Sequence, residues 1–323
     1  MTAAAQPGTS ARPVAVFVLG MARSGTSALT RVLSLSGGTL PAGMKGADRG
    51  NPEGYWEPRK ASTLNEAILR RQGSSRFDPS LRLQEEGAFD AEERAACIAK
   101  VRAYLTTLPA APLVVIKYPL IVALSDVWFE AARLAGFDIA AVIAVRHPQE
   151  VIASLGRFGG RSSPELSGAL WLKYSLLSER YTRGFPRVFV EYANLLDDWR
   201  REVKRISAAL GVDLNTQNER AVDEFLKQDL HRQRHCGPVT ALFGADWVSA
   251  VYEALGAAAR EEPWDGSALD RVFEAYRASE HDFRKVFEDR DRLHKANRLI
   301  PPSIERLVLE VVALAQRRRG TWA

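Results

Sequence analysis

The sequence predicts an α/β domain built on a parallel β-sheet of four to five strands flanked by helices. Four short apolar runs, at 14–20, 113–117, 140–145 and 187–191, are uninterrupted rather than alternating, which is typical of strands covered on both faces. Helical patterns follow these runs along the chain. Alternation of strands with helices indicates a parallel sheet.

Several helix boundaries can be placed between and after the strands. Thr26 to Leu35 carries an apolar stripe and ends before two glycines. Ser125 is expected to be the N-cap of the helix after the second run, and Pro148 suits the first position of the helix after the third. Two further apolar stripes, within 166–181 and 195–210, predict helices packed on the core.

The chain is expected to form one domain from 13 to 323 after a disordered N-terminus at 1–12. Beyond about 221 no strand pattern is found, so a helical C-terminal lid at about 221–323 is predicted beside a core at about 13–220. The loop at 36–60 is long and rich in glycine and proline but carries aromatic residues. Loops of this length in compact domains are usually functional or disordered, and the aromatic residues argue against disorder.

Composition limits the class of protein. A chain of 323 residues with 46% hydrophobic content can bury a full core. Two cysteines without metal-ligand spacing suit a reducing compartment, and no secretory signal or transmembrane segment is recognised, so a cytoplasmic protein is expected. The charge of +5 and pI near 9.3 suit an enzyme of a polyanionic nucleotide. The dense basic run at 316–320 is interpreted as a solvated helix end, so no nucleic-acid partner is expected.

A phosphate-binding loop is predicted at the end of the first strand, where Gly20 to Ser27 reads GMARSGTS. A nucleoside triphosphate loop has the same glycine spacing but carries lysine where Thr26 stands. Amides of 24–27 would face an anion at the helix N-terminus, and Arg23 supplies a forked cation. The alternative, that the glycines only shape a tight turn, is less favoured. The candidate binding residues are Arg23, Ser24, Gly25, Thr26 and Ser27.

A second anion site is predicted at the end of the third strand. Arg146 leaves that strand and Ser154 follows eight residues later. Because ligands of open parallel sheets bind beyond the carboxyl ends of the strands, Arg146 can meet a second anionic group. The second strand ends in Lys117 rather than in a magnesium-binding aspartate, so no metal is expected.

The runs ARSGTS and RHPQEVIAS together resemble the sulfotransferase family that uses 3′-phosphoadenosine 5′-phosphosulfate (PAPS). In that family the first motif binds the 5′-phosphosulfate and the R-x₇-S pattern binds the 3′-phosphate. The segments NPEGYWEP, LNEAIL, ALWLKYS and RVFVEYANLL are similar to its bacterial branch. Over 14–212 the resemblance implies a P-loop-like sulfotransferase fold, PAPS as sulfuryl donor, adenosine 3′,5′-bisphosphate (PAP) as product, and a nucleotide site that includes Arg146, Ser154 and Tyr192.

The resemblance also implies catalytic residues. Lys117 lies where relatives often read K-D-P-R, and with Arg23 it would neutralise charge on the leaving phosphate oxygen. Tyr118 and Leu120 replace the aspartate and arginine of that run, which predicts a reshaped acceptor side. Ala22 replaces the usual proline before Arg23, a mild change.

The base that takes the acceptor proton is expected on the long loop. Pro119 stands where some relatives carry a histidine base, so that base is excluded. Glu57 is the preferred candidate, because its aromatic neighbours could desolvate it and raise its pKa, and Glu53 is less favoured. The alternative for Glu57 is a carboxylate that caps the next helix or pairs with Arg59.

Two other functions remain open from the residues. A P-loop phosphoryl transferase, such as a small-molecule kinase, would leave Arg146 and Ser154 unexplained. A nucleic-acid binder depends only on the basic charge. The acceptor is expected to be a hydroxyl of a glycan, a glycolipid or a small molecule, and neither its identity nor the oligomeric state can be derived from the sequence.

Overall fold

The structure is a computed structural model that describes residues 12–48, 51–157, 162–215, 218–226, 239 and 246–297, with Arg284 the one side chain described beyond Glu280. The expectations for residues 1–11 and for the basic run at 316–320 lie outside these residues. The chain divides into two compact units, Met1–Ala275 and Tyr276–Ala323, which are described separately. The division into a core and a lid near 220 stays a prediction.

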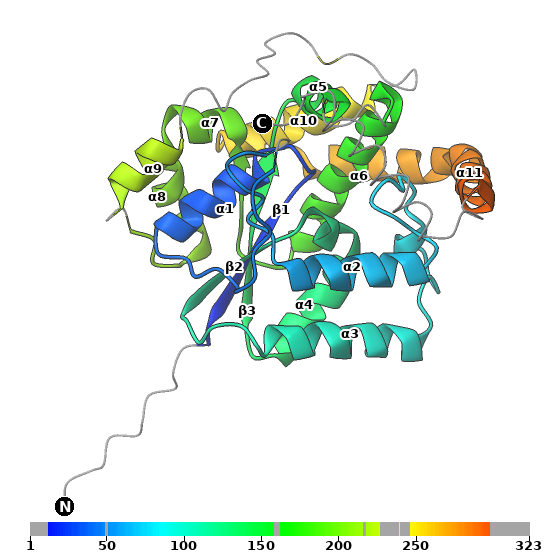
Figure 1. Cartoon of the computed structure of the whole chain (residues 1–323). Helices are drawn as coiled ribbons and strands as arrows, with labels where there is room; N and C mark the ends of the chain where they lie inside the picture. Colours follow the sequence, from blue (N-terminus) through cyan, green and yellow to red (C-terminus); the bar gives the residue numbers. More distant parts are fainter. Residues whose placement is uncertain are drawn as a thin grey trace, which may run out of the picture. The chain divides into compact units, whose positions relative to one another are not determined.

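The sheet contains four parallel strands in the order β2-β1-β3-β4 (Figure 1). The strands are β1 (Val14–Leu19), β2 (Leu113–Lys117), β3 (Asp138–Val145) and β4 (Arg187–Glu191). All four lie where the apolar runs predict them, although β3 begins two residues earlier and β1 ends one residue earlier than expected. The predicted α/β class with a parallel sheet is therefore confirmed.

Helices connect the strands and also follow β4 in the described residues. They are α1 (Thr26–Leu35), α2 (Arg59–Arg71), α3 (Ala91–Leu105), α4 (Ser125–Leu134), α5 (Pro148–Arg157), α6 (Pro164–Thr182), α7 (Tyr192–Asp197), α8 (Trp199–Leu210), α9 (Glu219–Phe225), α10 (Trp247–Ala259) and α11 (Gly266–Asn297), with 3₁₀ turns η1 (Arg82–Gln84) and η2 (Pro119–Leu124). The predicted N-cap at Ser125 is wrong. Leu124 is the N-cap, and the Ser125 hydroxyl donates to the carbonyl oxygens of Ile121 and Val122.

Each face of the sheet is covered by helices, as Figure 1 shows for α1 and α8 on one side and α4 on the other. On the first side Val16 and Val18 of β1 share a buried cluster with residues of α1 and α8. On the other side Phe17 packs edge-on against Trp128 and Phe129 of α4. Burial on both faces explains why the strands are apolar without alternation.

Parallel pairing brings the carboxyl ends of the strands to one edge. Val18 is paired with Lys117, Leu19 with Ile143, and Val145 with Glu191. The residues that follow these strands therefore meet at the same edge, the position where ligands of such sheets bind.

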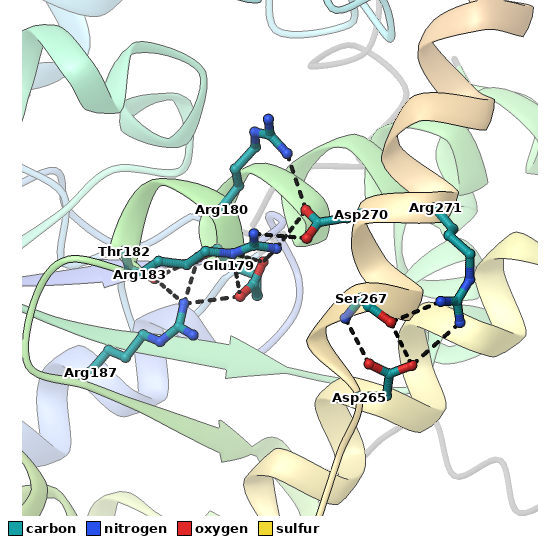
Figure 2. A network of polar contacts seen from close by, with 9 residues as sticks. All are labelled: Glu179, Arg180, Thr182, Arg183, Arg187, Asp265, Ser267, Asp270 and Arg271. Atoms are coloured by element: carbon teal, nitrogen blue, oxygen red, sulfur yellow. Dashed lines mark hydrogen bonds and ion pairs between the residues drawn. The ribbon is translucent and has the colours of Figure 1, made fainter.

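An ion-pair network connects α6, β4 and the start of α11 (Figure 2). The Glu179 carboxylate of α6, 2% exposed, accepts hydrogen bonds from Arg183 at 2.8–3.0 Å and pairs with Arg187 of β4 at 3.1 Å. Arg183 also reaches Asp270 of α11 at 2.8 Å. Removing one partner of a buried carboxylate–guanidinium pair leaves an uncompensated buried charge, so loss of Glu179 or of its arginine partners is expected to destabilise the fold.

The second unit contains the C-terminal part of α11. There Arg284 pairs with Glu280 one helical turn earlier. Among the helices in the described ranges, none combines the length and the apolar character that crossing a membrane requires.

Candidate anion-binding and catalytic site

The loop after β1 has two positions that only glycine fits. Gly20 has φ +127°, and a Cβ there would lie 2.7 Å from the carbonyl oxygen of Ala144. Gly25 has φ +88°, and its Cβ would lie 2.3 Å from the ring of Tyr192. Both glycines are therefore required for the backbone conformation of the loop and for its close approach to Ala144 and Tyr192.

The loop leads into an uncapped helix N-terminus. The N-cap of α1 is Gly25, which has no side chain that could cap the first-turn amides. Such amides need an external partner, and the helix dipole makes an anion the favoured one. The amide of Ser24, which the sequence also assigned to the anion, donates to the Met21 carbonyl at 3.1 Å, so it is engaged inside the loop.

Arg23 contacts Ser154 and Arg146, and its backbone is strained. Its φ is +74°, the left-handed region that costs a non-glycine residue about 1–2 kcal/mol. Its Nε donates to the Ser154 hydroxyl of α5 at 3.0 Å, and its carbonyl accepts from Arg146 at 3.0 Å. Ser154, expected at a 3′-phosphate, thus also holds the arginine of the phosphate loop.

Arg146 lies where β3 ends, with only 10% of its side chain exposed. Its Nε donates to Glu150 of α5 at 2.7 Å, and its guanidinium lies 4.7 Å from the ring centroid of Tyr192. The Trp171 indole donates to its main-chain oxygen at 3.2 Å. Buried polar groups are stable only when paired in this way, so the orientation of Arg146 is fixed.

A pocket opens between these elements. It is lined by Arg23, Gly25, Thr26, Ser27, Ala28, Asn51, Pro52, Glu53, Gly54, Arg146, Tyr192 and Phe225. Sequence reasoning missed Asn51, Pro52, Gly54, Phe225 and Ala28 as site residues. The first three lie in the NPEG run, whose family pattern could have indicated them. Phe225 ends a helix as an ordinary apolar residue and gives no such signal.

Lys117 is buried next to Ser27, a residue of the pocket lining, with 1% of its side chain exposed. Its ammonium donates to the Ser27 hydroxyl at 3.0 Å, to the Tyr55 main-chain oxygen at 2.7 Å and to Glu57 Oε1 at 2.8 Å. Burial lowers the pKa of Lys117, while the Glu57 carboxylate opposes that shift. The three hydrogens of the ammonium have three acceptors within the protein, so any further acceptor has to replace one of them.

Hydrogen bonds hold the loop that carries Glu57 next to Lys117 and Ser27. Asn51 donates to the Ser27 hydroxyl at 3.3 Å and to the Gly54 carbonyl at 2.6 Å, and the Tyr55 hydroxyl donates to Asp48 at 2.8 Å. Glu57 is 6% exposed. Its partner is thus Lys117, rather than Arg59 as in the alternative interpretation. Glu53 is exposed at the pocket rim.

The predicted site residues therefore form two connected groups. Arg23, Gly25, Thr26, Ser27, Arg146 and Tyr192 line the pocket, and Ser154 joins it through Arg23. Lys117 and Glu57 are linked to it by Ser27. In the described part of the chain, no group of three or more His, Cys, Asp or Glu residues is arranged to hold a metal ion.

No protein-family model and no curated protein sequence matches the chain. The sulfotransferase domain of the Synechococcus PCC 7002 olefin synthase aligns with 85% of this chain and 98% of its own, at 20% identity and a TM-score of 0.39. Mouse sulfotransferase SULT7A1, complexed with PAP, aligns with 82% and 89%, at 14% identity and a TM-score of 0.39. Both of these solved structures are described as sulfotransferases.

Proposed function

We propose that the protein transfers a sulfuryl group from PAPS to an acceptor hydroxyl. One observation carries this proposal: an uncapped helix N-terminus and two guanidinium groups, of Arg23 and Arg146, border one pocket. A donor with an anionic group at each end of its ribose requires two such anion sites. The strand beside the loop ends in Lys117, a cation where a nucleotide triphosphatase would use a magnesium-binding aspartate.

The donor would lie across the pocket with its 5′-phosphosulfate on the loop. The amides of the first turn of α1, together with the hydroxyl groups of Thr26 and Ser27, are donors suited to its oxygens. Arg146 would meet the 3′-phosphate, beside the ring of Tyr192. Arginine binds such oxyanions in a forked, charge-assisted geometry.

In the reaction, the bond between sulfur and the 5′-phosphate oxygen breaks as the acceptor oxygen bonds to sulfur. The leaving oxygen becomes part of the phosphate of PAP, and charge develops there that Arg23 and Lys117 neutralise. The hydroxyl proton of the acceptor passes to the Glu57 carboxylate. Lys117, Arg23 and Glu57 are thus the proposed catalytic residues.

The Glu57–Lys117 ion pair gives these two residues an order of action. The Glu57 carboxylate accepts a hydrogen bond of 2.8 Å from one of the three N–H groups of the ammonium. An incoming sulfonate competes for that hydrogen because it is also an anion. When Lys117 turns to the donor, Glu57 loses its partner and becomes available as a base. Donor binding therefore prepares the base for the acceptor.

The acceptor is proposed to be a hydroxyl of a glycan, a glycolipid or a small molecule. The test is incubation with ³⁵S-labelled PAPS and pools of each acceptor class, followed by separation of labelled products. We expect label in an acceptor and release of PAP in the presence of a chelator. Phosphate transfer from ATP with magnesium, and no transfer from PAPS, would identify the protein as a phosphoryl transferase instead.

A further inference from the structure

Helix α5 holds both arginines of the donor pocket from one face. Glu150 and Ser154 are four residues apart, a spacing that brings side chains to the same side of a helix. Glu150 accepts from Arg146 at 2.7 Å and Ser154 accepts from Arg23 at 3.0 Å. The two arginines are also joined, because Arg146 donates to the Arg23 carbonyl at 3.0 Å.

The contact with the Arg23 carbonyl falls where the loop is strained. A left-handed arginine persists only when its surroundings hold it, and the Arg23 carbonyl is fixed by Arg146. The Arg146 guanidinium is in turn oriented by the Glu150 carboxylate, whose side chain is 6% exposed. The loop conformation therefore depends on a residue of α5 that does not line the pocket.

We propose that Glu150 is a positioning residue of the donor site, which acts through Arg146 to hold the phosphate loop in its anion-binding conformation. This inference rests on the proposed function, since it assumes that the pocket binds the donor nucleotide. It joins the two anion sites into one unit. Loss of the hydrogen-bond acceptor at Glu150 must then weaken a ligand that has only a 5′-phosphate as well as one that also carries a 3′-phosphate.

The charge of Glu150 distinguishes positioning from a direct electrostatic effect. A carboxylate beside Arg146 lowers the positive potential of the pocket, so by charge alone it weakens phosphate binding. Its benefit comes from orienting the guanidinium. Glutamine keeps a hydrogen-bond acceptor for Arg146 Nε and removes the negative charge, whereas alanine removes both.

The experiment measures dissociation constants of adenosine 5′-phosphate and PAP by calorimetry. The proteins are the parental protein, Glu150→Ala, Glu150→Gln and the control Glu130→Ala, which removes an exposed carboxylate paired with Arg133 on α4. We expect Glu150→Ala to weaken both ligands by about tenfold or more, the loss of one charge-assisted hydrogen bond. For Glu150→Gln, the dissociation constants of both ligands are expected to rise by no more than about threefold over those of the parental protein. The control Glu130→Ala is expected to bind both ligands unchanged.

Ser154→Ala gives a second test if Glu150→Ala does not fold. Because Ser154 holds Arg23, its loss should weaken adenosine 5′-phosphate and PAP by the same factor. Unchanged affinity for adenosine 5′-phosphate in Glu150→Ala, or a loss in Ser154→Ala confined to PAP, overturns the inference. A parental protein that binds both nucleotides but transfers no sulfuryl group contradicts the proposed function alone. Binding of neither nucleotide overturns both.

Discussion

Replacing Glu57 by glutamine tests the proposed base and the ion pair together. The variant keeps the shape of the side chain and an acceptor for Lys117, but it cannot take up the acceptor proton. Loss of a general base lowers turnover by about 10²–10⁴-fold. PAP affinity should persist or rise, because the ammonium of Lys117 no longer has an anionic partner.

The stability effect of Glu57→Gln follows from the burial of both partners. Lys117 and Glu57 are 1% and 8% exposed at their side chains, and removing one partner of such a pair costs about 3–5 kcal/mol. Because glutamine still accepts a hydrogen bond, we expect a smaller loss, about 1–3 kcal/mol. Adding Lys117→Met should recover part of it, since no buried ammonium then remains without a counter-charge.

The assay is single-turnover transfer of ³⁵S from PAPS, with calorimetry for PAP and denaturant unfolding for stability. Glu53→Gln is the matched control, because Glu53 lies on the same loop but is exposed. Its turnover should stay close to that of the parental protein. A folded Glu57→Gln variant that turns over at nearly the parental rate would refute the assignment of Glu57 as the base.

Three further outcomes are expected. Gly25→Ala should abolish PAP binding, because Gly25 has φ +88° and the added Cβ would also lie 2.3 Å from the ring of Tyr192. Gly43→Ala is the control, since Gly43 has φ +70° but no atom within 4 Å of the added Cβ. The control adds backbone strain alone and should leave binding unchanged, as calorimetry can check. Glu179→Gln should lower the free energy of unfolding by about 2–4 kcal/mol. Asp270→Asn should lower it by less than about 1 kcal/mol, because the Asp270 side chain is 43% exposed. Equal losses in urea unfolding would contradict this difference. Burial lowers the pKa of Lys117 below its ordinary 10.5. Between the folded and unfolded pKa values the unfolded state therefore binds more protons, and the stability contributed by this group rises with pH across that window. Lys117→Met should reduce the slope of unfolding free energy against pH, and an unchanged slope would show that Lys117 is not its source.

The strands and the phosphate loop could be predicted because their signals are local. An apolar run buried on both faces is readable over as few as five residues, as β2 and β4 show. The glycines at 20 and 25 mark backbone conformations that few other residues adopt. Parallel pairing then fixes which strand ends meet, so Arg146 could be assigned to the same edge as the loop.

The contacts between side chains could not be predicted in this way. Lys117 and Glu57 are 60 residues apart in sequence and meet only because the long loop folds back over β2. The contact of Ser154 with Arg23 likewise depends on where α5 lies. The N-cap at Ser125 failed because a 3₁₀ turn precedes the helix and supplies carbonyl acceptors to that hydroxyl, a tertiary detail that capping preferences do not contain.

Binding of PAP in the presence of a chelator tests the central claim most directly, since it requires the two anion sites but no knowledge of the acceptor. Calorimetry on the parental protein and on Arg146→Ala is sufficient. We predict that the parental protein binds PAP without divalent cations and more tightly than adenosine 5′-phosphate. In Arg146→Ala both affinities should fall, that for PAP by the larger factor. Absence of PAP binding, or nucleotide binding only as ATP with magnesium, would contradict the account.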